Sequence, residues 1–238
     1  MSPVIQTSRL TKSYGPLLAL KGLDLSVERG TVCGLLGANG AGKSTAIACM
    51  LGLQRPSSGA VQILGQDPRI ARKQLFKQVG VQLQETSFQE KITAEELCQV
   101  SAALYHRPHD YRQLLAQFGL ADKAGRPVKE LSGGQRQKLF ITLALLPNPQ
   151  VVFLDELTTG LDPRARREVW AILSSLKASG VTILLTSHFM DEVEALCDHI
   201  CILKHGKTVF SGTVGQAVAD SPYTAFEDAY LWYTEEDR

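Results

Sequence analysis

The sequence predicts an α/β protein with a mainly parallel sheet, an N-terminal antiparallel β subdomain and a helical subdomain. Three observations lead to this fold class. The first sixty-odd residues alternate apolar and polar side chains as β-strands do. After Pro149, strand and helix patterns alternate, which favours a parallel sheet covered by helices on both faces. From about Thr93 to Leu146 the pattern is helical, so we expect one domain over residues 1–238 with a helical subdomain at about 93–146.

The N-terminal part contains four expected strands and one helix. The segments "VIQTSRL" and "LLALKGLDLSVERG" are typical of strands, with a turn near Glu28–Gly30. A third strand, "TVCGLLG", runs directly into a glycine-rich loop, and "KSTAIACMLGL" follows that loop as a helix. The turn residues "RPSSG" then lead into a short strand, "GAVQILG".

The helical subdomain carries recognisable end signals. Thr93 and Glu96 have the spacing of a capping box ahead of apolar residues that recur on one helix face. The amphipathic segment "YRQLLAQFGL" stops at Gly119. Both patterns support helices rather than strands in this stretch.

Strands and helices alternate again in the C-terminal part. Expected strands are 151–156, 181–188 and 199–210, and expected helices are 162–180 and 189–197. In the longer helix, Asp162 stands where an N-cap belongs, Pro163 at the first helical position and Gly180 just past the end. This order extends the parallel sheet.

Composition excludes several classes of protein. The net charge of +1 gives no general attraction to nucleic acid or an anionic membrane surface, so we expect no nucleic-acid partner. Apolar stretches such as "LFITLALL" are far shorter than the roughly 20 residues of a membrane helix. The N-terminus lacks the pattern of a secretory signal, and five cysteines suit a reducing compartment. We therefore expect a soluble cytoplasmic protein.

A phosphate-binding loop is the firmest local prediction. The run "GANGAGKST" matches G-x-x-x-x-G-K-[ST] between a strand and a helix, which is the setting this loop needs. The glycines let backbone N–H groups face phosphate oxygens, and the helix N-terminus adds a positive dipole end. Lys43 would reach the β- and γ-phosphates, and Ser44 would ligate Mg²⁺. The residues expected to contact the nucleotide here are Gly37, Ala38, Asn39, Gly40, Ala41, Gly42, Lys43, Ser44 and Thr45.

Two carboxylates follow a buried strand at "VVFLDE". Ligands of open parallel sheets bind at the carboxyl ends of the strands, where Asp155 and Glu156 are placed. Asp155 suits a Mg²⁺ shell, and Glu156 suits a general base that polarises an attacking water. A solvated acidic strand end is the alternative, but the preceding phosphate loop favours catalysis.

A second anion site is predicted at "LSGGQRQKL". Ser132 and Gln135 have the spacing of a capping box, so a well-capped helix explains part of the pattern. Gly133 and Gly134 in the first turn cost helix stability, roughly 1 kcal/mol each relative to alanine. What they provide is exposed backbone N–H groups at a positive helix end. One nucleotide needs only one such loop, so the second requires a different explanation.

With these motifs in this order, the chain resembles the ATP-binding cassette (ABC) ATPases, whose signature motif is LSGGQ. The resemblance covers nearly the whole chain and implies a P-loop NTPase core with ATP and Mg²⁺ as cofactors. In that family two cassettes dimerise head to tail, and the signature of one closes over the γ-phosphate held by the other. Ser132, Gly133, Gly134 and Gln135 would thus serve the partner's nucleotide.

The resemblance also implies roles for residues with weaker signals of their own. Tyr14 resembles the aromatic residue that stacks on adenine, although a lone tyrosine in a strand-rich region is more often core. Gln84 resembles the glutamine that meets Mg²⁺ and links to the transmembrane partner. Asp162 resembles the aspartate that crosses the dimer interface, and His188 the histidine that contacts the γ-phosphate and holds Glu156 in position.

Two further patterns qualify the resemblance. Leu157 follows Glu156 where the family usually has proline, which keeps an apolar contact but frees the backbone. Cys197, His199 and Cys201 stand close together, but their spacing fits no strong zinc pattern, which favours core cysteines.

The resemblance further implies how the chain is used. One phosphate loop and one signature make a single cassette, so we expect a second ABC ATPase subunit, identical or related, and separate transmembrane permease subunits. The C-terminal sequence "FEDAYLWYTEEDR" resembles export-type cassettes, which implies ATP hydrolysis coupled to export at the cytoplasmic face of a membrane. Two alternatives are a soluble ATP-driven conformational switch that regulates another protein and a phosphotransferase, which has no use for LSGGQ.

Overall fold

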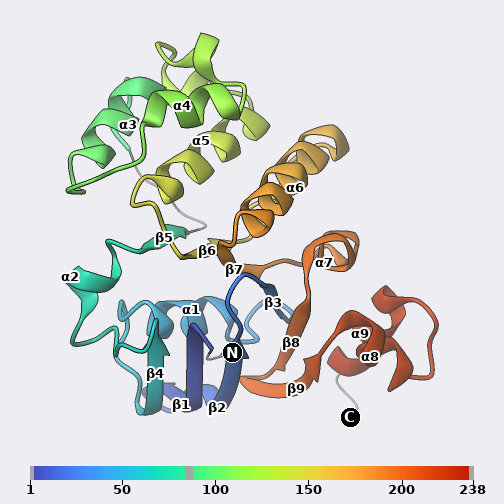
Figure 1. The fold of residues 1–238 in the computed structure, drawn as a ribbon. Helices are drawn as coiled ribbons and strands as arrows, with labels where there is room; N and C mark the ends of the chain where they lie inside the picture. The colour runs from blue at the N-terminus through green and yellow to red at the C-terminus, as the bar shows by residue number, and fades with distance from the viewer. Residues whose placement is uncertain (1–2, 84–87, 236–238) are drawn as a thin grey trace.

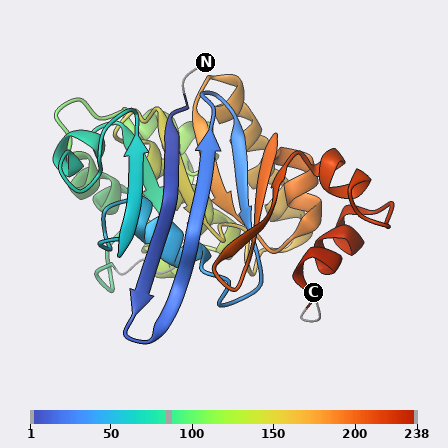
Figure 2. The ribbon, with the colours of Figure 1, turned by 90° about the horizontal axis from the view of Figure 1, so that it is seen from below.

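The computed structural model describes residues 3–83 and 88–235, which form two sheets and several helices (Figure 1). The smaller sheet is antiparallel and has the order β2-β1-β4. Its strands are β1 (Ile5–Tyr14), β2 (Leu17–Val27) and β4 (Ser58–Ile63). Seen from below, these strands lie side by side in front of the rest of the molecule (Figure 2). The predicted N-terminal antiparallel sheet is confirmed.

The larger sheet has the order β5-β6-β7-β3-β8-β9 and is parallel except at its β8–β9 edge. Its strands in chain order are β3 (Val32–Leu36), β5 (Val79–Gln82), β6 (Val151–Asp155), β7 (Thr182–Thr186), β8 (His199–Lys204) and β9 (Lys207–Gly212). The predicted α/β class with a mainly parallel sheet is confirmed. The segment 199–210 was expected as one strand but forms a hairpin, because His205 and Gly206 both adopt positive φ and reverse the chain.

The two faces of the larger sheet bury different helices. Val151 and Phe153 of β6 pack in the same core as α1 (Lys43–Met50) and the antiparallel sheet. Val152 and Leu154, which alternate with them, pack in a second core with α5 (Gly133–Leu145) and α6 (Pro163–Ala178). Because successive side chains of a strand point to opposite faces, α1 and α5 lie on opposite sides of the sheet.

The helical insert forms its own layer. The helices α3 (Ala94–Ala102) and α4 (Tyr111–Gln117) pack with α5 around a separate apolar cluster, and Figure 1 shows the three together at one end of the molecule. Thr93 and Glu96 form the predicted capping box, with the Thr93 hydroxyl accepting from the Glu96 N–H. The structure is consistent with a helical subdomain at about 93–146, which we retain as a proposal.

The remaining helices cover the edges. The helices α7 (Met190–Leu196) and α9 (Phe226–Thr234) share a third apolar cluster with β8, and α8 (Val214–Ala219) packs against it. Some elements were not predicted from the sequence: α8, α9, the short α2 (Arg72–Leu75) and β5. Within the residues described, no helix has both the length and the apolar character needed to cross a bilayer.

Candidate functional site

The phosphate loop joins β3 to α1 in the predicted strand–loop–helix order. Gly37, Gly40 and Gly42 all adopt positive φ, at 148°, 81° and 107°. A Cβ on Gly37 would lie 2.5 Å from the backbone oxygen of Leu203, and one on Gly42 would lie 2.8 Å from that of Ala19. Both glycines are therefore required by backbone conformation and by close contact with neighbouring strands.

The loop surrounds a buried lysine and leaves its tip exposed. Lys43 is only 6% exposed, and its Nζ donates to the backbone oxygens of Gly37 at 2.7 Å and Ala38 at 3.2 Å. Burial lowers the pKa of Lys43, and the carboxylates of Glu156 and Asp155 partly oppose this shift. The ammonium group thus lies at the loop, within the electrostatic reach of Glu156, the predicted general base, and of Asp155, the predicted Mg²⁺ ligand.

The rest of the loop is arranged as an open cradle. Ala38, Asn39 and Gly40 are exposed, whereas Ala41 is buried and donates its N–H to Ala38 at 3.0 Å. In the first turn of α1, Ser44 is exposed and Thr45 is partly buried. A cradle of this shape can accept phosphate oxygens at its backbone N–H groups.

Asp155 and Glu156 lie at the carboxyl end of β6 and are both held by Thr186 of the neighbouring strand β7. The Thr186 hydroxyl donates to Asp155 Oδ1 at 2.5 Å and accepts from the Glu156 N–H at 2.9 Å. Thr186 is 1% exposed and Asp155 5%. Glu156 has φ of 50°, a left-handed conformation that is uncommon outside glycine and costs of order 1 kcal/mol. Thr186 therefore fixes an otherwise unfavourable turn.

Thr186 is a site residue that the sequence interpretation missed. A signal for it was present, because "LLTSH" places a hydroxyl at the end of a buried strand parallel to "VVFLDE". In the structure Asp155 and Thr186 are register partners across β6 and β7. The pairing is what brings the hydroxyl to the carboxylate.

His188 follows β7 and approaches Glu156. Its Nδ1 lies 3.8 Å from Glu156 Oε1, which is within ion-pair distance but longer than a hydrogen bond. The imidazole side chain is 40% exposed, whereas the Glu156 side chain is 12% exposed. Lys43, Asp155, Glu156 and His188 thus form one group around the phosphate loop, which we call the phosphate-loop cluster.

The signature motif begins α5 and packs against α6. Ser132 and Gln135 form the predicted capping box, with Ser132 Oγ accepting from the Gln135 N–H at 3.3 Å and Gln135 Oε1 accepting from the Ser132 N–H at 3.1 Å. A Cβ on Gly134 would lie 2.9 Å from the Cβ of Ala165 in α6. Gly134 therefore has a packing reason in addition to its expected exposure of backbone N–H.

Asp162 is the predicted N-cap of α6, with Pro163 at the start and Gly180 beyond the end. Its Oδ1 accepts from the N–H groups of Arg164 at 2.9 Å and Ala165 at 3.0 Å. These hydrogen bonds hold the pKa of Asp162 below its usual range. Because Ala165 also meets Gly134, Asp162 and the signature residues form a second group, the signature cluster.

Tyr14 ends β1 and is not a core residue. It is 43% exposed, and the Lys12 ammonium lies 4.9 Å from the centroid of its ring. Leu17 and Leu18, across the hairpin, are 64% and 41% exposed. The hairpin thus presents an accessible aromatic ring, as a base-stacking role requires. Gln84 lies outside the described residues.

The remaining sequence observations also have structural outcomes. Leu157 is 3% exposed and packs in the core beside α5 and α6, so the predicted apolar contact is made. Cys201 is fully buried, whereas His199 Nε2 lies 3.0 Å from Ser211 Oγ. Within residues 3–83 and 88–235, no group of histidine, cysteine and carboxylate side chains is arranged to hold a metal ion.

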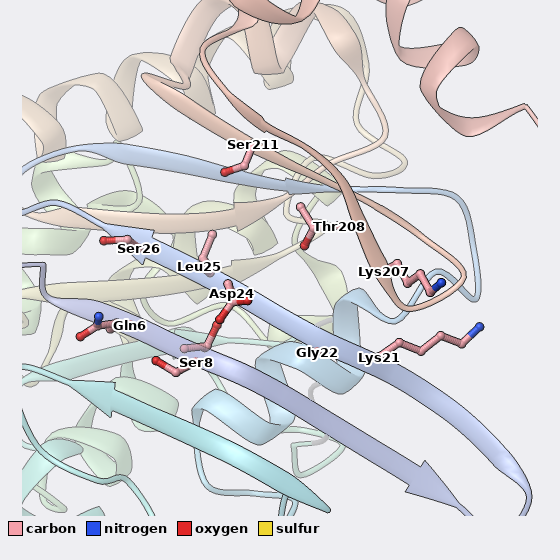
Figure 3. Close-up of a pocket in the computed structure, with 11 residues that line it drawn as sticks. Gln6, Ser8, Lys21, Gly22, Asp24, Leu25, Ser26, Lys207, Thr208 and Ser211 are labelled. Atoms are coloured by element: carbon pink, nitrogen blue, oxygen red, sulfur yellow. The ribbon is translucent and has the colours of Figure 1, made fainter. Parts of the chain in front are cut away.

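A separate open groove lies between β2 and β9 (Figure 3). Its volume is about 700 Å³, and Lys21 and Lys207 lie at one end with Ser26 and Ser211 towards the other. None of the predicted site residues lines it. The phosphate-loop cluster, which combines a lysine, two carboxylates and a histidine, is the stronger candidate for chemistry.

Comparison with known protein families decides which family the chain belongs to. The family described as ABC transporter matches residues 20–159, more than half of the chain. The chain belongs to the ABC transporter family. The matched segment includes the phosphate loop, the signature motif and both carboxylates after β6. The chain is therefore an ABC ATPase, and ATP is its nucleotide.

Similar proteins agree with this assignment. The Nod factor export ATP-binding protein I of Ralstonia nicotianae is 40% identical over 217 residues, covering 89% of this chain and 67% of that protein. The daunorubicin/doxorubicin resistance ATP-binding protein DrrA of Streptomyces peucetius is 39% identical over 217 residues, covering 89% and 66%. This chain thus spans about two thirds of the length of these curated relatives.

Solved structures agree as well. A structure described as the ATP binding subunit of an ABC transporter matches with a TM-score of 0.88 and 28% identity, covering 98% of this chain and all of that one. A second, described as cbiO1 from Clostridium perfringens, part of the ABC transporter complex cbiONQ, matches with a TM-score of 0.82 and 27% identity, covering 92% of each chain.

Proposed function

We propose that this ABC ATPase pairs with a second ABC ATPase subunit around two ATP molecules and drives export through separate transmembrane permease subunits. One observation carries the proposal. The phosphate-loop cluster lies by the N-terminus of α1 and the signature cluster by the N-terminus of α5, and these two helices cover opposite faces of the same sheet. Two such clusters make a complete site when one chain supplies the phosphate loop and its partner supplies the signature.

ATP fits the residues of the phosphate-loop cluster. Only glycine fits at Gly37 and Gly42, where a Cβ would meet the backbone of a neighbouring strand, and the tip of the loop is exposed to a ligand. Lys43, which donates to two loop oxygens, would donate to the β- and γ-phosphates instead. The exposed ring of Tyr14 would stack on the adenine.

Mg²⁺ fits the oxygen donors next to the phosphates. Ser44 is exposed in the first turn of α1, which follows β3, and Asp155 places a buried carboxylate at the carboxyl end of β6, separated from β3 by β7. Hydroxyl, carboxylate and amide oxygens are ligands that Mg²⁺ prefers, and Gln84 would supply the amide. When bound, the ion would neutralise charge on the phosphates.

Glu156 and His188 are proposed to carry hydrolysis. Glu156 would accept a proton from the water that attacks the γ-phosphate, because its carboxylate lies at the strand end beside Asp155 and the loop lysine. His188, 3.8 Å from Glu156, would hold that carboxylate in position and contact the γ-phosphate.

The partner subunit would complete each site. Ser132, Gly133, Gly134 and Gln135 would face the γ-phosphate bound by the other subunit, where their hydroxyl and N–H groups would act as donors. Asp162 would cross the same interface. Hydrolysis would replace one bridging phosphate by two repelling products and reopen the dimer.

The proposed direction of transport, export, is inferred from the names of the similar proteins. Both curated relatives are named for export or for drug resistance, and ABC subunits of this kind work with membrane permeases. We place the chain at the cytoplasmic face of a membrane, held there by its permease. The conformational change on closure of the dimer would be transmitted to that permease through the Gln84 region and the helical subdomain. A soluble ATP-driven switch is not favoured, because the similar proteins are transporter subunits.

The proposal can be tested by recovering the assembled transporter. Tagged Glu156→Gln protein should be purified from detergent-solubilised membranes with ATP and Mg²⁺, and a multi-span membrane protein should copurify. The matched control is the same preparation without nucleotide. An ATP-dependent dimer that copurifies with no membrane protein would overturn the transport role while leaving the composite site intact.

A further inference from the structure

The ring of Phe189 contacts both the predicted catalytic residue His188 and Arg166 of α6. The centroids of the His188 and Phe189 rings are 4.5 Å apart, with the planes inclined by 41°. The Arg166 guanidinium carbon lies 3.9 Å from the Phe189 centroid. This is a close cation–π contact, since such contacts extend to about 6 Å. The Phe189 ring is therefore in contact with both the His188 imidazole and the Arg166 guanidinium.

Both ends of this contact are fixed by other groups. The Phe189 N–H donates to the buried Ser187 Oγ at 3.0 Å, which holds the chain immediately after His188. Arg166 Nη1 lies 3.3 Å from Asp191 Oδ2 in α7, and this ion pair holds the guanidinium near the Phe189 ring. The arginine side chain is only 17% exposed, which is unusual for a residue of a surface helix. Phe189 thus has little freedom to move away from the imidazole.

Arg166 also belongs to the first turn of α6. Its backbone N–H donates to the backbone oxygen of Asp162 at 3.0 Å, one helical turn back. One turn of α6 therefore begins at Asp162 of the signature cluster and ends at Arg166, which contacts the Phe189 ring. Farther along, Trp170 Nε1 donates to the buried Glu192 Oε1 at 2.9 Å, so α6 and α7 are joined at a second point.

We propose that Arg166 is a positioning residue for ATP hydrolysis. Its guanidinium holds Phe189 against His188, so that the imidazole stays directed at Glu156. The same helical turn begins at Asp162. A shift of Asp162 at the proposed dimer interface would therefore move Arg166 and Phe189, and with them the His188 ring. The inference rests on the proposed roles of Glu156 and His188, and it assigns a physical link between the two clusters.

The linkage has a distinct kinetic consequence. Arg166 contacts Phe189 and Asp191 and is not one of the residues proposed to bind ATP, so its loss should leave those residues in place. A displaced imidazole instead affects the reacting geometry, where a misplacement of about 1 Å costs on the order of 10²-fold in rate. Removal of the guanidinium should therefore lower kcat rather than raise KM.

The test compares Arg166→Ala with Arg167→Ala in the purified full-length protein. Arg167 is the next residue of α6 and is exposed, so it controls for loss of one positive charge on this helix. We expect Arg166→Ala to lower kcat by about 10- to 100-fold with KM for ATP changed less than about twofold. Arg167→Ala should retain the wild-type kcat. Arg166→Lys keeps the cation but loses the planar guanidinium, so it should lie between the two.

A double-mutant cycle shows whether Arg166 acts through Phe189. Phe189→Leu should lower kcat similarly, and adding Arg166→Ala to it should cost less than about twofold more. The proposal would be overturned if the loss of kcat in the double variant equalled the product of the two single losses. A wild-type kcat in Arg166→Ala would overturn it as well. If Arg166→Ala does not fold, Phe189→Leu against Phe189→Tyr, which keeps the ring, decides the same question. Wild-type and Glu156→Gln turnover are measured alongside, because equal turnover of those two would refute the proposed function instead.

Discussion

Thr186 offers a direct test of how the catalytic strand ends are held. The substitution Thr186→Val keeps the shape and the β-branching that suit a buried strand, but it removes the hydroxyl. That hydroxyl donates to Asp155 Oδ1 at 2.5 Å and accepts from the Glu156 N–H at 2.9 Å. The variant therefore removes both hydrogen bonds and opens no cavity.

The size of the effect follows from two opposing contributions. A hydrogen bond to a charged group contributes about 1.5–3 kcal/mol, and Asp155 is too buried to regain a water. The new methyl group offsets about 0.8 kcal/mol of this through burial. The Glu156 N–H retains a second, longer contact with the Thr186 backbone oxygen at 3.3 Å. We therefore expect the free energy of unfolding to fall by about 1–2 kcal/mol.

Urea unfolding of the nucleotide-free protein measures this change, and steady-state ATP turnover measures its catalytic effect. Turnover should fall at least about tenfold, because Asp155 and Glu156 both lose a positioning contact. Thr186→Ser keeps the hydroxyl and should retain most of the turnover. If Thr186→Val matched the wild type in stability and turnover, or if the serine variant lost as much turnover, the role assigned to this hydroxyl would be wrong.

Three further predictions concern the signature, the adenine platform and pH. Gly134→Ala should lower the free energy of unfolding by about 1–3 kcal/mol in urea, because its Cβ would meet Ala165 at 2.9 Å; Gly133→Ala, with more space, should change it by less than about 1 kcal/mol. Tyr14→Ala should raise the KM for ATP about tenfold, whereas Tyr14→Phe, which keeps the ring, should not. Burial lowers the pKa of His199 below 6.5, so the unfolded chain binds more protons there and stability falls as the pH drops through that value. His199→Gln should lose less stability than the wild type when unfolding is compared at about pH 7.5 and pH 5.5.

The elements that were predictable from the sequence are those with strong local signals. The glycine loop, the capping box at Ser132 and the Asp162–Pro163 helix start are set by residues only a few positions apart. Hydrogen bonds and φ preferences at that range do not depend on distant parts of the chain, so the pattern alone indicates them. The parallel sheet was predicted from the alternation of strand and helix patterns along the chain after Pro149.

The missed features depend on tertiary contacts. Strand β5 has only four residues, and Gly80 in it is required because a Cβ there would lie 2.1 Å from the Ala144 oxygen. Thr186 gains its partners only when β6 and β7 align in register. Arg166 is separated from Phe189 by a full strand, so no spacing rule brings them together. The segment 199–210, expected as one strand, is a hairpin whose turn uses His205 and Gly206, both with positive φ.

Tyr14 is a residue whose role was predicted from the family resemblance rather than from a local pattern. The local signal of this residue favours a core tyrosine. The structure adds that the ring is 43% exposed, which disagrees with a core role and agrees with an accessible platform. Its contact with adenine remains a prediction that the KM comparison tests.

The most direct test of the central claim is the mass and nucleotide content of Glu156→Gln protein held with ATP and Mg²⁺. Loss of the general base should slow turnover on the order of 10²–10⁴-fold, so the closed state should accumulate. The account predicts a dimer of ABC subunits that contains two ATP molecules. A monomer that holds one ATP, with turnover equal to the wild type, would contradict the composite site and the role of Glu156 together.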